Sequence, residues 1–373
     1  MARWWRLILA VGLLGALPLA AAEKFRVKYF LDKDDESLGI IELNFLTARR
    51  AVAIGQLDTN KRRYGVMLST SDGGETWQSE PLKDLPRSLF FLNDSLGWMV
   101  TERGVWQTEE GGRSWRKLSG EQSIARVHFL DAQRGFAVGA LKKLLATKDG
   151  GKTWAKVPAG DLPETRPDFT VYSQIVSPEP NWLLVAGTSI PPRRQSRRDL
   201  PPWLEPEEAK HRTQRPTVML VVESRDGGVT WRHGTTSMFG RIAKVTVGAG
   251  KVGLGIFQFD DQFDWPAEVY KLTLNNGRST RVFRYKDRLV TDGLIEPDGS
   301  AYLAAIEPAT EVRGIPIPGK VHIHRSRGSE MDLWAEVPVD YRAVASRATL
   351  ARSPDGSMWL VTSAGMILKL EDR

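Results

Sequence analysis

The chain has 373 residues, with 52 Lys and Arg against 45 Asp and Glu, a formal charge of +7 and no cysteine. The lack of cysteine excludes disulfides, thiolate chemistry and lipid attachment through a cysteine, whereas the length allows a sizeable apolar core. The basic excess suits an acidic partner surface but is too small to indicate nucleic acid, for which no motif is present.

Residues 1–22 predict a Sec-type signal peptide. Arg3 and Arg6 precede an apolar stretch from Leu7 to Leu19, and Ala20–Ala22 offers a small-residue cleavage site. The apolar stretch is shorter than the about 20 residues that span a bilayer. We therefore expect export to the periplasm or the extracellular space, with residues 23–373 forming one domain. An uncleaved anchor is the alternative.

Four segments repeat nearly the same pattern, [Ser/Thr]-x-Asp-x-Gly-x-[Ser/Thr]-Trp. They occupy residues 70–77, 108–115, 147–154 and 224–231, and the second has Glu110 at the Asp position. The closing tryptophans lie 38, 39 and 77 residues apart, so the spacing is close to one or two periods. A fixed period of this size indicates a repeat architecture. The short apolar runs before the segments are typical of strands that lead into a hairpin turn.

We interpret each segment as a structural turn. The carboxylate accepts hydrogen bonds from backbone N–H groups of its own turn, the glycines allow positive φ, and the tryptophan is buried between neighbouring sheets. A calcium loop is disfavoured because it needs about six oxygen ligands, and a catalytic carboxylate is not needed four times. The expected structural residues are Asp72, Gly74, Trp77, Glu110, Gly112, Trp115, Asp149, Gly151, Trp154, Asp226, Gly228 and Trp231.

These segments resemble the Asp-box, or bacterial neuraminidase repeat, of sialidases, sortilin-type receptors and photosystem II stability/assembly factor propellers. With the segments 88–100 and 127–139 that lead into the second and third copies, the unit is most similar to the photosystem II stability/assembly factor group. The resemblance implies a β-propeller that binds protein and helps membrane complexes to assemble. It implies neither catalysis nor a cofactor.

Turn signals followed by a strand that opens on an apolar residue occur seven times, which predicts an all-β, seven-bladed propeller of four-stranded blades. The turns are 47–52, 93–98, 131–136, 177–182, 248–253, 296–302 and 353–359. The last unit lacks an outer strand, and residues 24–31 are expected to supply it and close the ring. Decayed copies of the repeated turn are expected at Thr273–Thr280 and before Trp334.

The long connections fall between the second and third strands of their blades, at 56–64, 189–216, 258–267 and 307–319, and therefore on one face. Binding is expected there. The proline- and arginine-rich insertion at 189–216 is either a partner-binding segment or a mobile solvated loop. The acidic residues of the 258–267 loop either bind a cation or a sugar or balance the charge of the arginines. We favour the charge balance. The candidates are Arg193, Arg194, Arg197, Arg198, Trp203, Asp260, Asp261, Asp264, Trp265 and Arg313.

Enzymatic activity is the alternative. The Arg-Ile-Pro motif of sialidases is missing, and Arg313-Gly-Ile-Pro316 is the nearest string. A glycosidase would need two carboxylates about 5–10 Å apart, for which Asp260, Asp261, Asp264, Glu307 and Glu311 are available. His322 and His324 have a spacing that suits a metal, but no third ligand is near, so we expect surface or wall histidines and no metal.

The sequence thus favours a non-catalytic, exported scaffold or assembly/accessory factor that binds a protein partner or an envelope membrane complex through one face. We expect no cofactor and a chain that is monomeric by itself. The alternative is a carbohydrate-active protein, either a glycosidase, sialidase-like or not, or a lectin-like glycan binder.

Overall fold

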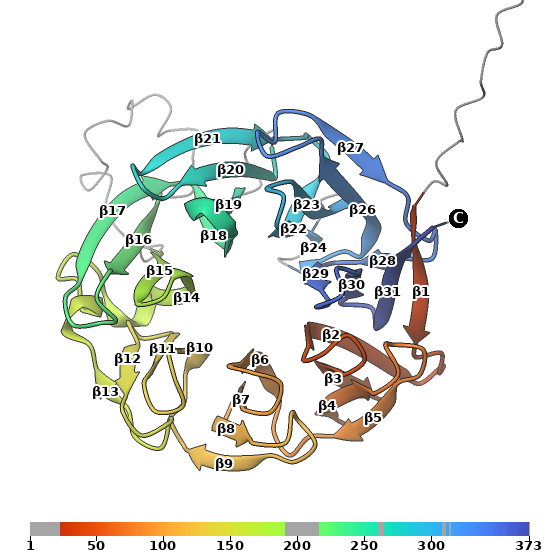
Figure 1. The fold of residues 1–373 in the computed structure, drawn as a ribbon, viewed down its shortest axis with the longest axis horizontal. Coiled ribbons are helices and arrows are strands. Elements are labelled where there is room, and N and C mark those ends of the chain that lie inside the picture. Colours follow the sequence, from red (N-terminus) through yellow and green to blue (C-terminus); the bar gives the residue numbers. More distant parts are fainter. Residues whose placement is uncertain (1–22, 191–215, 260–264, 308–310, 313–314, 373) are drawn as a thin grey trace, which may run out of the picture.

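The computed structural model describes residues 23–372 apart from 191–215, 260–264, 308–310 and 313–314. The chain forms a ring of seven antiparallel sheets around a central axis (Figure 1), which confirms the predicted seven-bladed β-propeller. Besides strands, the described residues form only short 3-10 turns, at Pro158–Gly160, Pro167–Phe169 and Ala249–Lys251. Among these residues, no helix has the length and hydropathy needed to cross a membrane.

Each blade is described from its innermost strand outward. The first four blades are β2 (Glu36–Phe45), β3 (Ala51–Thr59), β4 (Arg63–Thr70), β5 (Gln78–Pro81); β6 (Pro86–Phe91), β7 (Gly97–Thr101), β8 (Gly104–Thr108), β9 (Arg116–Ser119); β10 (Ile124–Phe129), β11 (Gly135–Gly139), β12 (Leu144–Thr147), β13 (Ala155–Lys156); and β14 (Thr170–Glu179), β15 (Trp182–Ser189), β16 (Thr217–Ser224), β17 (Arg232–Met238).

The fifth blade repeats the same order, and the sixth adds short strands. They are β18 (Gly240–Val247), β19 (Val252–Phe259), β20 (Ala267–Thr273), β21 (Arg278–Phe283); and β22 (Leu289–Ile295), β23 (Ala301–Glu307), β26 (Gly319–Ser326), β27 (Trp334–Val337). A hairpin of β24 (Glu311–Val312) and β25 (Ile315–Pro316) lies between β23 and β26, and β28 (Val344–Ala345) also pairs with β26.

The seventh blade combines the two ends of the described chain. It contains β29 (Ala348–Arg352), β30 (Met358–Thr362), β31 (Met366–Glu371) and, as its outer strand, β1 (Lys24–Phe30). β1 pairs antiparallel with β31 from Lys24 opposite Glu371 to Phe30 opposite Met366. The N-terminal strand therefore closes the ring, as the missing outer strand predicts.

Apolar side chains fill the spaces between adjacent blades. The second strands β7, β11 and β30 are buried at every residue, because each lies between two neighbouring strands and two neighbouring blades. One cluster joins residues of β23 and β26 to residues of β29, β30 and β31, and another joins β30 and β31 to β2, β3 and β4. The core is thus a ring of inter-blade contacts.

Six innermost strands carry a β-bulge at the same place, before Glu42, Ser88, Arg126, Gln174, Lys244 and Asp292. Four of these side chains reach the innermost strand of the next blade. Glu42 Oε2 accepts from the N–H of Leu89 at 3.0 Å, and Asp292 Oδ2 accepts from that of Leu350 at 2.9 Å. The Ser88 hydroxyl and the Gln174 amide donate to the next blade in the same way. Bulges re-aim side chains, and here they form a polar ring around the axis.

The repeated turns fasten one blade to the previous one. In the first, Asp72 Oδ1 accepts from the N–H groups of Glu75 and Thr76 at 3.1 and 3.0 Å, and the Thr70 hydroxyl donates to it at 2.7 Å. The Trp77 indole donates to the Gly74 carbonyl at 3.1 Å. Its ring lies against Trp359 of the preceding blade, with centroids 6.5 Å apart.

The second glycine of the turn is required by this contact. Gly228 has φ +90°, and a Cβ there would lie 2.2 Å from the Phe136 ring of the preceding blade. Gly74 is similar, because its Cβ would lie 2.3 Å from Trp359. Only glycine accepts both the positive φ and the close approach.

The turn before Trp334 keeps the shape of the repeated turns without their carboxylate. Trp334 Nε1 donates to the Met331 carbonyl at 2.8 Å and to the Val282 carbonyl of the preceding blade at 2.9 Å. Met331 has φ +59° and takes the place of the glycine. The decayed copy is therefore present here.

Two expectations about connections need correction. At Thr273–Thr280 the N–H groups of Asn276 and Gly277 bond to the Thr273 carbonyl, and β21 resumes at Arg278, so the connection is a tight hairpin that lacks the repeated turn. Residues 56–64 are not a loop, because β3 and β4 remain paired as far as Asp58 and Arg63. The excess length extends the hairpin and leaves a short connection.

Candidate partner-binding face

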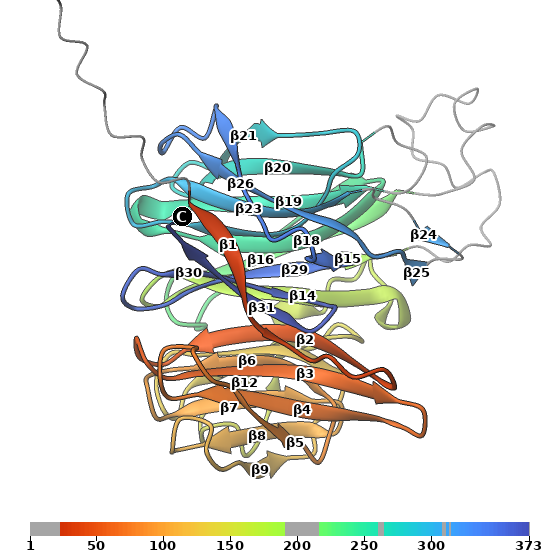
Figure 2. The same cartoon turned by 90° about the vertical axis from the view of Figure 1, so that its right-hand side faces the viewer.

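The connections between second and third strands share one face of the ring with the connections between successive blades. Figure 2 shows the β24–β25 hairpin at the same end of the ring as the β3–β4 hairpin. We call this the loop-bearing face, and the opposite face, which holds the repeated turns, the turn-bearing face. Most predicted binding residues lie outside the described residues, so their placement is untested: Arg193, Arg194, Arg197, Arg198, Trp203, Asp260, Asp261, Asp264 and Arg313.

Trp265 is the one predicted partner-binding residue that the structure describes. It is half-buried, and the Arg284 guanidinium lies 4.0 Å from its ring centroid, with the Lys286 ammonium at 5.5 Å. Both cations belong to the connection 284–288 between blades 5 and 6. Cations at these distances are attracted to the electron-rich face of an indole. The two cations therefore hold the ring of Trp265 in place.

Tyr285 extends this group toward solvent. Its side chain is 45% exposed, and its ring stacks on His324 with centroids 5.7 Å apart and lies tilted against Phe283 at 4.8 Å. The Arg288 guanidinium lies 5.5 Å from the centroid of the Tyr285 ring. We call Trp265, Arg284, Tyr285, Lys286 and Arg288 the blade 5–6 cluster.

Ion pairs with a buried carboxylate hold Arg281 and Arg284 in place. Glu268 is buried, and its Oε1 lies 3.3 Å from Arg281 and 3.0 Å from Arg284. The Tyr270 hydroxyl donates to Glu268 Oε2 at 2.8 Å. A buried carboxylate needs such partners. Arg284 therefore pairs with Glu268 through Nη1, while the plane of its guanidinium covers Trp265.

A histidine network supports the cluster from blade 6. His322 is buried, with Nδ1 2.6 Å from Glu336 Oε1 and Nε2 2.7 Å from Glu307 Oε2, the second contact being an ion-pair distance without hydrogen-bond alignment. Arg288 completes the network, because it lies 3.4 Å from both carboxylates and donates to His324 Nε2 at 2.9 Å.

Burial and neighbouring groups shift the pKa values of His324 and Glu336. Burial, helped by the Arg288 charge, lowers the pKa of His324 to about 4, so this ring is neutral at pH 7. Burial acts to raise the pKa of Glu336, but the hydrogen bond with His322 and the nearby positive charges outweigh it and lower that pKa. Both histidines are buried in the wall of their blade, which is the second of the two places expected for them.

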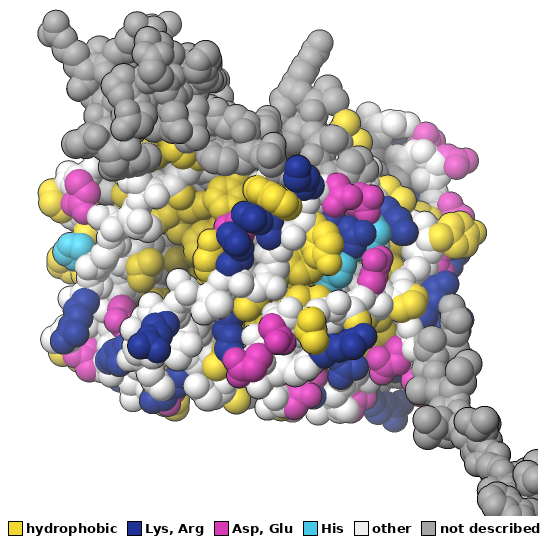
Figure 3. Space-filling model, turned by 90° about the horizontal axis from the view of Figure 1, so that it is seen from above, with side chains coloured by type: hydrophobic (Ala, Val, Ile, Leu, Met, Phe, Trp, Pro, Cys, Tyr) yellow, Lys and Arg dark blue, Asp and Glu magenta, His cyan; other side chains and the backbone are white. Residues whose placement is uncertain are grey.

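The carboxylates beside His322 are already paired. Glu307, a candidate for a glycosidase pair, is engaged by His322 and Arg288, and nothing is described of the side chain of Glu311. No group of three or more His, Asp or Glu in the described part of the chain could hold a metal ion. Figure 3, which looks onto the side of the ring that is uppermost in Figure 1, shows both charges and histidine mixed with apolar surface.

The loop-bearing face also exposes most of the large apolar side chains that the described residues leave open to solvent. Besides Tyr285 they include Leu141, Ile190, Ile317 and Tyr341, whose side chain is 82% exposed. Val229 and Leu333 lie instead on the turn-bearing face. Apolar groups scattered among charges suit a broad protein contact better than a closed substrate pocket.

The carboxylates of the repeated turns are unsuited to acid or base catalysis. The Thr230 hydroxyl and N–H lower the pKa of Asp226 to about 2, and the corresponding threonines hold the pKa of Asp72 and Asp149 well below their usual range. The Glu110 carboxylate accepts from the Ser114 hydroxyl at 2.7 Å, and within the described residues no backbone N–H donates to that carboxylate. These groups serve the turn.

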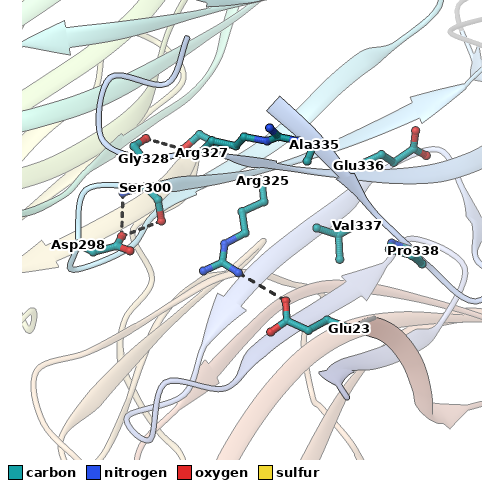
Figure 4. Close-up of a pocket in the computed structure, with 11 residues that line it drawn as sticks. Glu23, Asp298, Ser300, Arg325, Arg327, Gly328, Ala335, Glu336, Val337 and Pro338 are labelled. Carbon is teal, nitrogen blue, oxygen red and sulfur yellow. Dashed lines mark hydrogen bonds and ion pairs between the residues drawn. The ribbon is translucent and has the colours of Figure 1, made fainter. Parts of the chain in front are cut away.

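A cavity of about 500 Å³ lies on the rim of blade 6, beside the start of β1 (Figure 4). Arg325 points across it to Glu23, with Nη1 3.5 Å from Oε2, and its guanidinium also covers the Tyr302 ring at 5.2 Å. Asp298 accepts from the hydroxyl and N–H of Ser300, and these bonds lower its pKa. Glu23 and Asp298 are thus both engaged by neighbouring groups.

Sequence reasoning missed the connection 284–288 and the histidine network as a unit. The alternation His322-x-His324 gave a signal, because it places both rings on one face of a strand, but their partners come from three other elements. The string Arg284-Tyr-Lys-Asp-Arg288 was a second signal, since it is the most charged of the connections between blades 5, 6 and 7.

The sequence matches no protein-family profile, and no curated protein is similar enough to match. Solved structures with the same fold are found. YCF48 bound to a D1 peptide is 15% identical, with a TM-score of 0.58 over 92% of this chain and 97% of that chain. YCF48 from Cyanidioschyzon merolae is 13% identical, with a TM-score of 0.59 over 94% and 99%.

A carbohydrate-active fold is also among the matches. An ancestral GH74 enzyme is 15% identical, with a TM-score of 0.51 over 74% of this chain but only 34% of that chain. At these identities the likeness concerns the fold. The resemblance to photosystem II stability/assembly factor propellers that the sequence indicates is confirmed at that level, by two YCF48 structures that this chain matches over nearly the full length of both chains.

Proposed function

We propose that this protein is a non-catalytic scaffold that binds a protein partner through its loop-bearing face and serves as an assembly or accessory factor outside the cytoplasm. The observation that carries the proposal is the blade 5–6 cluster. Its tryptophan, tyrosine and three cations stand together on that face and are braced by buried ion pairs. Tryptophan, tyrosine and arginine are the side chains that most often dominate protein interfaces.

The comparisons support the same proposal. YCF48 has been solved with a D1 peptide bound, so a propeller of this fold takes a peptide as its partner. This chain offers a mixed-charge, partly apolar face to a comparable ligand. Membrane complexes in the cell envelope are the partner class that we propose, because the N-terminal segment has the features of an export signal.

The experiment is capture of partners by the tagged chain from a crosslinked envelope fraction of its own host. Three altered proteins are compared with the native chain: Trp265→Ala, Lys286→Glu, and the reversal of Arg193, Arg194, Arg197 and Arg198 to Glu. Lys152→Glu is the matched control, because this exposed lysine lies in a repeated turn on the opposite face. Neither lysine has an ion pair within the described residues, so the two reversals are comparable.

We expect one membrane complex to be recovered with the native chain and with Lys152→Glu, and at least fivefold less with Trp265→Ala and Lys286→Glu. Loss with the arginine reversal would extend the site to the 189–216 insertion. Equal recovery by all variants would refute the loop-bearing face as the binding surface.

A carbohydrate-active protein is the second candidate, favoured by the likeness to a GH74 enzyme over 74% of this chain. It predicts binding on a glycan array that Trp265→Ala removes, and release of reducing sugar from a polysaccharide. Neither result is expected from the scaffold. Selective glycan binding without protein capture would replace the first proposal by the second.

A further inference from the structure

Five charged residues lie on or directly before innermost strands, which surround the axis of the ring (Figure 1). They are Glu42 of β2, Arg126 of β10, Lys244 of β18, Asp292 of β22 and Arg347, which directly precedes β29; we call them the axial cluster. The charge of Arg347 interacts with those of Asp292, Arg126 and Glu42, which belong to three other blades. Only a side chain on the axis has neighbours in blades so far apart around the ring.

Both carboxylates of the axial cluster are already engaged. Glu42 accepts from the Leu89 N–H at 3.0 Å and faces Arg126 Nη1 at 3.5 Å. Asp292 accepts from the Leu350 N–H at 2.9 Å and faces Lys244 Nζ at 3.1 Å. Each carboxylate thus serves one backbone group and one cation.

Arg347 is the cation that this arrangement leaves over. Within the described residues its guanidinium makes no hydrogen bond and no ion pair; its side chain keeps contact with solvent, although many protein atoms surround it. Its backbone is fixed on both sides, because its N–H donates to the Ser363 hydroxyl at 3.1 Å and its carbonyl accepts from the Ser363 N–H at 2.9 Å. The side chain therefore starts from a rigid point and ends with five free donors.

The surroundings of Arg347 favour an anion. The protein around it withdraws enough water to lower its pKa, with Asp292 opposing the change, and the group remains charged at neutral pH. A charge-assisted hydrogen bond gains strength where water is partly excluded. Arg126 and Lys244 add positive charge at the same place.

We propose that the axial cluster is a carboxylate-binding site in which Arg347 receives an aspartate or glutamate side chain of the docked protein. The inference rests on the proposed function, since it names the chemistry by which the partner is recognised. The guanidinium fork matches a carboxylate with two parallel hydrogen bonds. The blade 5–6 cluster would hold an aromatic or apolar part of the partner on the same face, and the axial site would select for acidity.

The test uses the full chain and a fluorescent Gly/Ser peptide that carries two adjacent glutamates, with the glutamine version as its neutral counterpart. Fluorescence anisotropy is measured for the native protein, Arg347→Gln and Arg347→Lys. Arg49→Gln is the matched control, because Arg49 is also exposed, also has a side chain without a partner in the described residues, and lies on the turn-bearing face. Thermal unfolding verifies that each variant is folded.

We expect Arg347→Gln to weaken binding of the glutamate peptide about tenfold, the loss of one charged hydrogen-bonding partner. Arg347→Lys should bind with intermediate strength, because it retains the charge without the fork, and Arg49→Gln should bind as the native chain does. The glutamine peptide should bind weakly and equally to all four proteins. Equal affinity of the native chain for both peptides, or no effect of Arg347→Gln, would overturn the axial site.

The two proposals fail separately. If capture of a membrane complex depends on Lys286 but not on Arg347, the loop-bearing face stands and the axial site is refuted. If the glutamate peptide requires Arg347 while no protein partner is captured, the axial site stands as an anion site and the scaffold proposal falls.

Discussion

The turns that join blades 1–4 to their predecessors differ from the turn of blade 6 in one chemical group. In blades 1, 3 and 4, an aspartate collects N–H and hydroxyl donors around itself, whereas the blade 6 turn has no such carboxylate. Both kinds nevertheless hold a positive φ three residues before the tryptophan and pack its ring against the preceding blade. The indole N–H varies more: it donates to a backbone carbonyl in blades 1, 4 and 6 and to Met67 Sδ in blade 2, and in blade 3 it has no partner among the described residues. The comparison indicates that the packed indole ring defines the turn and that the aspartate supports it.

The largest expected effect removes the indole from each kind of turn. Trp154→Ala and Trp334→Ala should each lower the free energy of unfolding by about 3–5 kcal/mol, because both rings pack against the preceding blade. Denaturant unfolding measures the change, and the Phe variants, which retain most of the apolar surface, should lose less. A loss below about 1 kcal/mol at Trp334 alone would mean that the blade 6 turn is held by something other than its indole.

The next effect concerns the glycine of the repeated turn. Gly228→Ala should lower the free energy of unfolding by about 2–4 kcal/mol, because strain at positive φ adds to the clash with Phe136. Gly250→Ala is the control, since Gly250 has φ +71° but no atom within 4 Å of a new Cβ, and it should lose only about 1–2 kcal/mol. Equal losses would show that the close approach to the neighbouring blade is relieved by movement.

The blade 5–6 interface also contains a buried histidine, a residue type that the repeated turns lack. Phe283 packs on both Trp334 and His324, and burial lowers the pKa of His324 to about 4. The unfolded chain then binds more protons between pH about 6.5 and about 4, so His324 costs the fold up to about 3 kcal/mol as the pH falls through this range.

The variant that isolates this contribution is His324→Gln, which retains an acceptor for Arg288. It should show a smaller fall in unfolding free energy than the native chain between pH 7 and pH 4. Parallel pH profiles of the two proteins would contradict the assignment of a neutral, buried His324.

The smallest expected effect sharpens the role of the carboxylate. Glu110 is one methylene longer than its counterparts and receives no backbone N–H, whereas Asp149 receives those of Lys152 and Thr153. Glu110→Asp should raise the free energy of unfolding by about 1 kcal/mol through the recovered hydrogen bonds. The reverse change, Asp149→Glu, should lower it by a similar amount. A neutral result for both would leave the carboxylate without a measurable part in stability.

The comparison also explains how far the sequence could be read. Each repeated turn is local, so eight residues that end at Trp77 or Trp231 specify its geometry, and the period between them specifies the ring. The spare strand at 24–30 followed from counting. Met331 could not be anticipated as the replacement for a glycine, because its positive φ is imposed by packing of Trp334 against the preceding blade. At Thr273–Thr280 the residue types fitted, but no tryptophan was there to hold the longer turn.

The candidate site was harder to read because its parts come from separate elements. Trp265 was found, but Arg284, Lys286 and the His322 network meet it only through the spacing of blades 5 and 6. The residues that follow the bulges share a pattern, an apolar residue, any residue and then a polar one, as in Ile40-Ile-Glu42 and Ile124-Ala-Arg126. That pattern was available, although a bulge is not visible in residue types alone.

Closure of the ring by β1 and β31 has a consequence for the order of events during synthesis. The pairing joins residues 24–30 to residues 366–371, so β1 cannot pair until β31 has left the ribosome. Contacts of such sequence separation form slowly, because a very long loop must close before they gain any stability. A nascent chain therefore keeps its N-terminal segment unpaired for most of translation, which leaves time for any machinery that must handle the polypeptide before it folds.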